Sequence, residues 1–347
     1  MEKKLLKWTT WSFGLMTVIM CATLYLMPFF EEGFSAAILT VPNFWPEESK
    51  ETNVQIDDDL DLPDDKLNIE LPEGVADEDV EIENDYVGHT VYVRFPKAVN
   101  NYSENHIVRG SSDHIAGLSY YKEDGKGVLE IKLDKACEHY YSYKDGFLRI
   151  EFMGLHDVYE QIVVIDAGHG GKQPGAVKKD INEKDLNLQI VQRLKELLDE
   201  VDEEKMKVFY TRLEDSNPSL QERAEMANQL QADLFISVHN NASASGKFTD
   251  LNGTMVLYSP DEQDDSSKRL AEICLKNVTA SAGSQNKGLV KGDNIYIVRT
   301  SEVPVALIEV GYMTNTVELN NLCSAAYQKK VAQGIYNAIM EAFEEGF

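Results

Sequence analysis

Two histidines of this chain are placed where they could do chemistry. His169 follows the apolar run 162–165, and His239 follows the apolar run 234–238. Runs of this length predict short buried strands, and ligands in open α/β sheets gather at the carboxyl ends of the strands. Two imidazoles delivered there are suited to hold a metal ion. The alternative is that both are solvated loop histidines.

A third ligand is needed, because a catalytic zinc site takes three protein ligands and leaves one position for water. The four cysteines show no C-x-x-C spacing and are poor candidates: Cys21, Cys137, Cys274 and Cys323. Glu183 is a better candidate, because it follows the glycine-rich stretch 168–175 and starts a segment with apolar residues at helical spacing. A carboxylate in the first turn also favours the helix dipole. Position alone therefore leaves Glu183 open between a ligand and a helix-terminal charge.

Glu309 lies inside the apolar run 303–312, which predicts a strand buried on both faces. Burying an unpaired carboxylate is costly, so this glutamate needs either a partner or a function. The partner would be a neighbouring backbone group or an arginine. The functional interpretation is a general base whose pKa is raised toward neutrality by burial. We expect Glu309 to be the residue that handles the proton.

Residues 161–347 resemble the catalytic domain of the zinc-dependent N-acetylmuramoyl-L-alanine amidases, the cell-wall hydrolases of the family called amidase type 3. The matching blocks run in the family's order along the whole segment: IVVIDAGHGG with PGAV, NEKDLNL, YTR, ER with AN, ADLFISVHNNA and VPVALIEVGYMTN. Three further matching residues are interpreted as structural or substrate-side groups: Arg212, Arg223 and Asn228.

The resemblance implies a role for each candidate residue. His169, Glu183 and His239 match the ligands of one Zn²⁺ ion, and Glu309 matches the catalytic glutamate. The implied reaction is hydrolysis of the amide bond between N-acetylmuramic acid and L-alanine of peptidoglycan, by zinc-activated water with Glu309 as general base and acid. Two rivals are a catalytically inactive peptidoglycan-binding or scaffold protein on the same fold, and a zinc hydrolase that acts on another peptidoglycan bond.

A nucleotide cofactor is not expected. Gly168-His169-Gly170 begins like a dinucleotide-binding fingerprint, but the position of the third glycine is Gln173. A phosphate-binding loop is also missing, because Lys172 is followed by Gln173 rather than by serine or threonine.

The fold class expected for 161–347 is α/β, with a mixed sheet flanked by helices, because strand and helix patterns alternate. After the helix that starts near Glu183, we expect strands at 207–211, 253–258, 295–299 and 303–310, and helices at 220–230, 266–279 and 326–343. The connection 242–252 holds only about a dozen residues, so we expect no inserted helix that plugs the site.

Residues 66–156 predict a small antiparallel β domain, because apolar and polar residues alternate in several short runs. The runs are 80–83, 90–95, 128–133 and 147–152, with hairpin turns at Asp124-Gly125 and Asp145-Gly146. In place and pattern this segment is similar to the AMIN-type domains that precede such amidases and are thought to bind wall polymers. A plain spacer is the alternative.

The N-terminus predicts a membrane anchor. Residues 8–30 carry no charge and are long enough to cross ~30 Å of hydrocarbon. Lysines precede the run and Glu31 and Glu32 follow it, so residues 1–30 should form a cytoplasmic stub and a transmembrane helix, with the catalytic domain extracellular. The rival is a signal peptide cleaved near Ala37, which would release a secreted form.

The formal net charge of −26 is concentrated near this anchor. Residues 31–85 hold 19 Asp and Glu against Lys50 and Lys66, a net charge of −17. We therefore expect 31–65 to be an acidic, self-repelling linker. So acidic a chain is not expected to bind nucleic acid. The expected partners are peptidoglycan and, through the N-terminal helix, the membrane.

Overall fold

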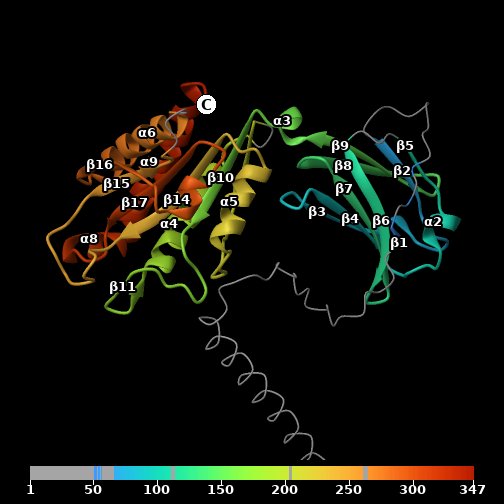
Figure 1. Ribbon diagram of the computed structural model, residues 1–347, viewed down its shortest axis with the longest axis horizontal. Helices are drawn as coiled ribbons and strands as arrows, with labels where there is room; N and C mark the ends of the chain where they lie inside the picture. Colours follow the sequence, from blue (N-terminus) through green and yellow to red (C-terminus); the bar gives the residue numbers. More distant parts are fainter. Residues whose placement is uncertain are drawn as a thin grey trace, which may run out of the picture. The chain divides into compact units, whose positions relative to one another are not determined.

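The computed structural model describes residues 66–110, 114–202, 205–260 and 265–347, together with residues 51, 52, 54 and 56. The predicted membrane-spanning run 8–30 and nearly all of the predicted linker 31–65 lie outside the described residues. Among the helices that are described, none is long and apolar enough to cross a membrane. From residue 48 onward the chain forms one compact unit, in which a β domain is followed along the sequence by an α/β domain (Figure 1).

Two antiparallel sheets make up the β domain, with strand orders β1-β6-β7-β4-β3 and β5-β2-β9-β8. The strands are β1 (Glu51–Thr52), β2 (Lys66–Glu70), β3 (Glu81–Asp85), β4 (Thr90–Phe95), β5 (Val108–Gly110), β6 (Ile115–Glu123), β7 (Lys126–Leu133), β8 (Cys137–Lys144) and β9 (Phe147–Gly154). Short helical turns are η2 (Asp77–Asp79), α2 (Tyr102–Asn105) and α3 (Leu155–Val158).

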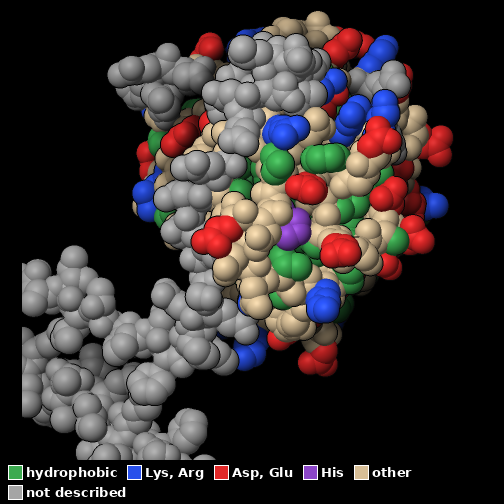
Figure 2. Space-filling model, turned by 90° about the vertical axis from the view of Figure 1, so that its right-hand side faces the viewer, with side chains coloured by type: hydrophobic (Ala, Val, Ile, Leu, Met, Phe, Trp, Pro, Cys, Tyr) green, Lys and Arg blue, Asp and Glu red, His purple; other side chains and the backbone are tan. Residues whose placement is uncertain are grey.

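One apolar cluster fills the space between these two sheets. Ile69 of β2 and Phe152 of β9 belong to the same buried cluster as Val93 of β4 and Ile131 of β7. Buried residues alternate with more exposed ones along β2 and β9, as in a sheet with one solvated face, whereas β7 is buried continuously from Gly127 to Ile131. On the face of the molecule in Figure 2, acidic and basic side chains are interspersed, as expected for a solvated surface.

The predicted hairpin turns are confirmed. At both Asp124-Gly125 and Asp145-Gly146 the two residues have positive φ, which is the conformation of a tight two-residue hairpin. The first sheet, however, begins earlier than the expected domain boundary at Lys66, because β1 pairs with Ser119 and Tyr120 of β6. Part of the predicted linker therefore belongs to the β domain.

A mixed six-stranded sheet with the order β13-β10-β14-β17-β15-β16 forms the α/β domain. Its strands are β10 (Gln161–Ala167), β13 (Met206–Tyr210), β14 (Leu234–Asn241), β15 (Thr254–Tyr258), β16 (Asn286–Lys291) and β17 (Val305–Tyr312), and a separate hairpin consists of β11 (Val177–Lys178) and β12 (Ile181–Asn182). The first four strands in the order are parallel, and β15 runs antiparallel to β17. The expected mixed sheet is confirmed.

Helices cover both faces of this sheet (Figure 1). They are α4 (Glu183–Leu198), α5 (Leu220–Gln229), α6 (Ser266–Ala282), α7 (Tyr296–Arg299), α8 (Thr316–Leu322) and α9 (Ala325–Glu344). Val163 and Ile165 of β10 pack in one buried cluster with α4, α6, α8 and α9, whereas Ile162 and Val164 pack in another with α5 and α7. Alternate residues of one strand thus face two cores, which explains its continuous apolar sequence.

The expected strand at 295–299 is wrong, because this segment forms the single helical turn α7. A short apolar run does not distinguish a strand from a helical turn by its periodicity. Here Ile297 and Val298, adjacent in sequence, are both buried in the cluster that contains α5. The sheet's last strand is instead the polar segment β16, at the edge. The connection between β14 and β15 contains no helix, as expected.

Candidate metal centre

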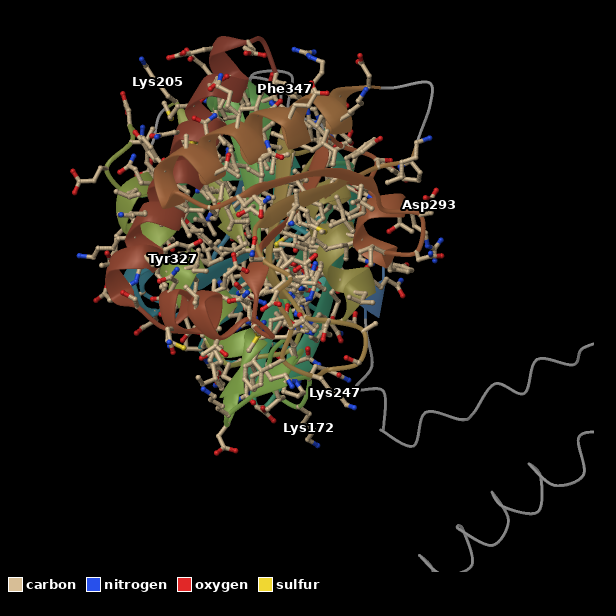
Figure 3. The ribbon with its side chains drawn as sticks, turned by 90° about the vertical axis from the view of Figure 1, so that its left-hand side faces the viewer. Lys172, Lys205, Lys247, Asp293, Tyr327 and Phe347 are labelled. Atoms are coloured by element: carbon tan, nitrogen blue, oxygen red, sulfur yellow. The ribbon has the colours of Figure 1, made fainter. Side chains whose placement is uncertain are left out.

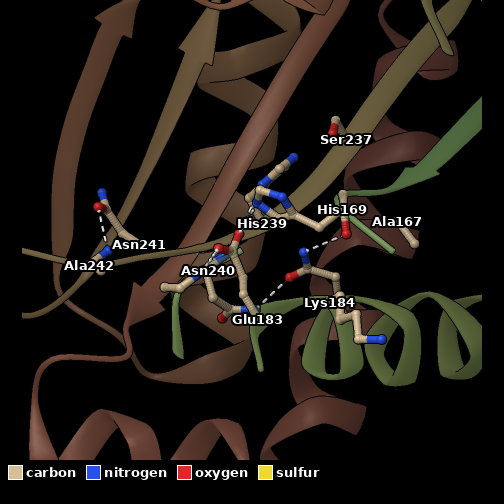
Figure 4. Close-up of polar contacts among 12 residues, drawn as sticks. Ala167, His169, Glu183, Lys184, Ser237, His239, Asn240, Asn241 and Ala242 are labelled. Carbon is tan, nitrogen blue, oxygen red and sulfur yellow. Dashed lines mark hydrogen bonds and ion pairs between the residues drawn. The ribbon is translucent and has the colours of Figure 1, made fainter. Parts of the chain in front are cut away.

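Three predicted ligands meet at one end of the sheet. His169 follows β10, Glu183 is the first residue of α4, and His239 lies in β14. The Glu183 Oε1 atom is 3.2 Å from His169 Nε2 and 2.9 Å from His239 Nδ1. The candidate ligand atoms of the three residues all lie within 4.8 Å of one another. Figure 4 shows Glu183 and His239 pointing toward each other from helix and strand.

The glycine-rich sequence allows the ligands to approach so closely. His169 itself has φ 61°, a left-handed conformation that is costly for a side-chain-bearing residue and is often found at functional sites. A Cβ atom at Gly168 would overlap the His239 ring, and one at Gly175 would lie 2.5 Å from Glu183 Oε2. The positions of these two glycines therefore require the absence of a side chain.

The Glu183 carboxylate is held by several donors. Its Oε2 accepts a hydrogen bond from the Ala176 N–H at 2.8 Å, and its Oε1 accepts one from the Asn240 N–H at 3.1 Å. Burial acts to raise the pKa of Glu183, but hydrogen bonds from His169 and His239 outweigh it and hold this pKa well below its usual range. Glu183 is therefore an ionised carboxylate, the form that binds a metal.

Glu309 lies beside these residues because β17 is the neighbour of β14. In the parallel pairing of the two strands Glu309 is the register partner of His239. The Glu309 Oε2 atom is buried and has no hydrogen-bond partner among the described residues. Burial raises the pKa of Glu309 to about 7, and the neighbouring Glu183 adds to this increase while His239 opposes it. A carboxyl group that is half-ionised near neutral pH can both accept and donate a proton.

Comparison with known proteins assigns this arrangement to a family. The family model described as N-acetylmuramoyl-L-alanine amidase matches residues 163–341. The chain belongs to this family. It is 33% identical over 186 residues to the N-acetylmuramoyl-L-alanine amidase LytC of Bacillus subtilis. This match covers 54% of this chain and 36% of LytC. It is also 33% identical over 183 residues to the uncharacterized protein YqiI of the same species, covering 53% of this chain and 85% of YqiI.

A solved structure of an amidase supports the same assignment. The N-acetylmuramoyl-L-alanine amidase from Clostridium difficile 630 superimposes with a TM-score of 0.50 and 30% sequence identity. The match covers 54% of this chain and 98% of that protein. The amidase family, a family of cell-wall hydrolases, thus accounts for the α/β domain, whereas these matches leave the β domain uncovered.

Two arginines that match the amidase blocks hold the backbone that carries His169. Arg212 donates to the carbonyl oxygens of Ala167 at 2.7 Å and Gly168 at 2.9 Å. Arg223 donates to the carbonyl oxygens of Ala167 at 2.9 Å and His169 at 2.7 Å. Both side chains are buried, so they act as structural groups that fix the turn after β10. Asn228, the third matching residue, lies elsewhere. Its side-chain amide donates to the Thr300 carbonyl oxygen and accepts from the Glu302 N–H, and so holds the segment 300–302.

Asp166 supports the amidase site but was not singled out from the sequence. This fully buried carboxylate pairs with Arg223 and accepts hydrogen bonds from Thr211 and Ser237, both at 2.6 Å. Burial acts to raise its pKa, but the charges of Arg223 and His239 hold the pKa below its usual range. The sequence signal for Asp166 was an aspartate at the end of an apolar strand. Its role could not be predicted from this signal, because its partners lie far along the sequence.

A pocket of about 490 Å³ opens beside the two histidines of the amidase site. It lies on the side of the sheet that carries α5 and α7. Its lining residues are Asp166, Gly168, His169, Gln173, Asn217, Pro218, Ser219, Leu220, Arg223, His239 and Ile297. The two candidate histidine ligands are therefore accessible to a substrate from this side.

Proposed function

We propose that residues 161–347 hydrolyse the amide bond between N-acetylmuramic acid and L-alanine of peptidoglycan. The observation that carries this proposal is the grouping of His169, Glu183 and His239 beside the unpartnered carboxylate of Glu309. Membership of the amidase family supports the choice of bond.

The donor set fits a zinc ion. Ligand atoms about 2.1 Å from a tetrahedral zinc ion lie about 3.4 Å apart, and Glu183 Oε1 lies 3.2 and 2.9 Å from the two histidine nitrogens. Two histidines and one glutamate are a ligand set known for catalytic zinc. When bound, zinc would supply polarisation of the scissile carbonyl and a water whose pKa is lowered to about 7.

Glu309 would move the proton in this reaction. Its Oε2 would accept the proton of the attacking water and then transfer it to the departing amine nitrogen of L-alanine. Three features support this role: the burial of Glu309, its unpartnered oxygen and its place next to His239 in the sheet. Arg212 and Arg223 would keep the His169 turn fixed during the reaction.

Digestion of purified peptidoglycan tests the proposal. The purified chain is stripped with a chelator, reloaded with Zn²⁺ and incubated with peptidoglycan, and the products are analysed by mass spectrometry. We expect new L-alanine amino termini that disappear with chelator and return with Zn²⁺. New reducing sugar ends or cut peptide cross-bridges would indicate action on another bond. Binding of peptidoglycan without any release would indicate the inactive scaffold.

We also infer where the enzyme works. The uncharged run 8–30, preceded by lysines and followed by Glu31 and Glu32, supports a membrane anchor with the catalytic domain outside. Protease treatment of intact cells should digest the catalytic domain, and a mature N-terminus near Ala37 would instead support a secreted form.

The place of the β domain directly before the amidase supports an AMIN-like module, which co-sedimentation with peptidoglycan would distinguish from a spacer.

A further inference from the structure

Two loops meet near the metal ligands and form a rim of lysines around one phenylalanine. The Lys178 ammonium group donates to the Gly246 carbonyl oxygen, which joins the β11–β12 hairpin to the connection after β14. Lys178 and Lys179 each place their ammonium nitrogen 5.4 Å from the centroid of the exposed Phe248 ring. We call Lys178, Lys179, Lys247 and Phe248 the lysine rim.

The lysine rim lies within reach of a molecule bound at the metal centre. The hairpin starts one residue after Ala176, whose N–H donates to Glu183 Oε2 at 2.8 Å. A chain advances at most ~3.6 Å per residue, so the Lys178 backbone lies within about 11 Å of Gly175, where even an added Cβ atom would overlap Glu183 and His169. Figure 3 shows Lys172, which precedes the hairpin, and Lys247 at the same end of the molecule.

The lysines of the rim carry charges that the described part of the protein does not neutralise. No described carboxylate lies within ion-pair distance of the three lysines of the rim, although Asp180 and Asp250 occur in the same loops. Four other lysines of the domain have a carboxylate partner: Lys184 with Asp215, Lys195 with Asp199, Lys207 with Glu138 and Lys276 with Glu341. Lys172, Lys329 and Lys330, like the lysines of the rim, have no described carboxylate within ion-pair distance. The domain as a whole has 28 acidic and 19 basic residues, a net charge of −9. The three lysines of the rim differ in lying together on two adjoining loops, so they form a local positive patch on a net-negative domain and attract an anionic ligand.

The backbone of the hairpin is strained where it presents one of these lysines. Lys179 and Asp180 have φ 49° and 63°, so the two-residue turn adopts the conformation normally taken by Asn-Gly. Side-chain-bearing residues adopt this conformation at a cost in free energy. Such strain occurs preferentially in segments that contact ligands.

We propose that the lysine rim binds the carboxylates of the substrate's peptide and so sets the direction in which the substrate lies across the metal centre. The inference rests on the proposed function, because it names the part of the muramoyl-peptide that each side of the site contacts. The hairpin leads into α4 on one side of the sheet, whereas the pocket lined by Asn217, Pro218 and Ile297 lies on the side of α5 and α7. The acidic peptide lies along the rim, and the sugar occupies this pocket.

Charge reversal combined with two substrates tests this direction. The full chain carrying Lys179→Glu and Lys247→Glu is compared with wild type on a muramoyl-peptide with free carboxylates and on the same compound with these carboxylates amidated. Lys205→Glu is the matched control, because this exposed lysine is at the opposite end of the domain (Figure 3). We expect a KM about tenfold higher for the acidic substrate only, since surface charge pairs contribute up to about 1 kcal/mol each.

The outcomes separate this inference from the proposed function. An equal loss on both substrates would indicate a structural role for the two lysines, and no loss on either would also overturn the inference. Binding of both compounds is measured in addition in a Glu309→Gln background, where turnover is not required. If wild type cleaves neither compound, the proposed function fails, and the binding preference for free carboxylates still decides the inference: its loss on charge reversal supports the rim, and its persistence contradicts it.

Discussion

Glu309 is the single residue on which the proposed chemistry depends most. Replacing it by glutamine keeps its size but removes the ability to accept a proton. We expect Glu309→Gln to bind Zn²⁺ like wild type and to lose at least ~100-fold in turnover, the contribution typical of general acid–base catalysis. Metal content measured by mass spectrometry, together with the rate of release of L-alanine amino termini, checks both halves of the prediction.

The matched control for this variant is Glu302→Gln, an exposed glutamate shortly before the same strand. It should retain full turnover. Undiminished turnover in Glu309→Gln would remove Glu309 from the mechanism, whereas loss of zinc would place it among the residues that maintain the site.

At the residue scale, the sequence predicted those side chains whose type and position stand out locally. His169 and His239 end apolar runs, and Glu309 interrupts one. Asp166 and Asn187 also contribute, the latter by donating to the Gly168 carbonyl oxygen at 3.0 Å. Their roles could not be predicted, because they depend on contacts between elements rather than on a local pattern.

The glycine-rich turn before α4 gives a prediction at the scale of elements. Gly175 and Gly283 have nearly the same backbone angle, φ 67° and 70°. A Cβ atom at Gly175 would lie 2.7 Å from the His169 ring and 2.5 Å from Glu183 Oε2, whereas one at Gly283 meets no atom within 4 Å. Both alanine variants should lose about 1–2 kcal/mol of stability from the left-handed backbone.

Zinc binding distinguishes the two variants. Gly175→Ala must displace a ligand, so we expect its zinc affinity to fall at least ~10-fold, the lower range for disturbing groups that orient ligands. Gly283→Ala should bind zinc like wild type. Competition with a chromophoric chelator measures both affinities. Equal zinc affinities in the two variants would mean that zinc binding does not depend on the space that Gly175 leaves for His169 and Glu183.

Long elements of the fold were predictable, and very short ones were not. The helices α5, α6 and α9 begin and end within a few residues of their predicted bounds, because each shows several turns of apolar periodicity. The two-residue strands β11 and β12 have too few residues for any periodicity. The hairpin of β11 and β12, which carries two lysines of the rim, therefore could not be predicted from the sequence.

At the scale of the whole molecule, a partly buried polar cluster joins the β domain to the amidase domain. Lys207 of β13 donates to Glu138 of β8 at 2.9 Å. Tyr86 and Tyr159 donate to the same carboxylate at 2.9 and 2.7 Å. Burial acts to raise the pKa of Glu138, but Tyr159, Lys207 and Tyr86 together hold it below its usual value.

Removal of the lysine should weaken this junction in a pH-dependent way. Lys207→Met leaves the buried Glu138 without its cation, which should cost about 1–3 kcal/mol at pH 7. Because the pKa of Glu138 is lowered by folding, its contribution is present above its unfolded value of about 4.5 and is lost as pH falls through the lower folded value. Denaturant unfolding at pH 7 and pH 3 should therefore show a deficit that shrinks with acid. Lys205→Met, exposed and near the same strand, should show no deficit at either pH.

The four groups of the site are contributed by β10, α4, β14 and β17, so the chain from residue 169 to residue 309 must be in place before they meet. Contacts so distant in sequence form late and slowly during folding. A chain that is still unfolded thus has no centre to hold a metal and no means to cut its substrate. Hydrolysis can begin only when β17 has joined β14, so the time of folding sets the earliest moment at which a new molecule can turn over.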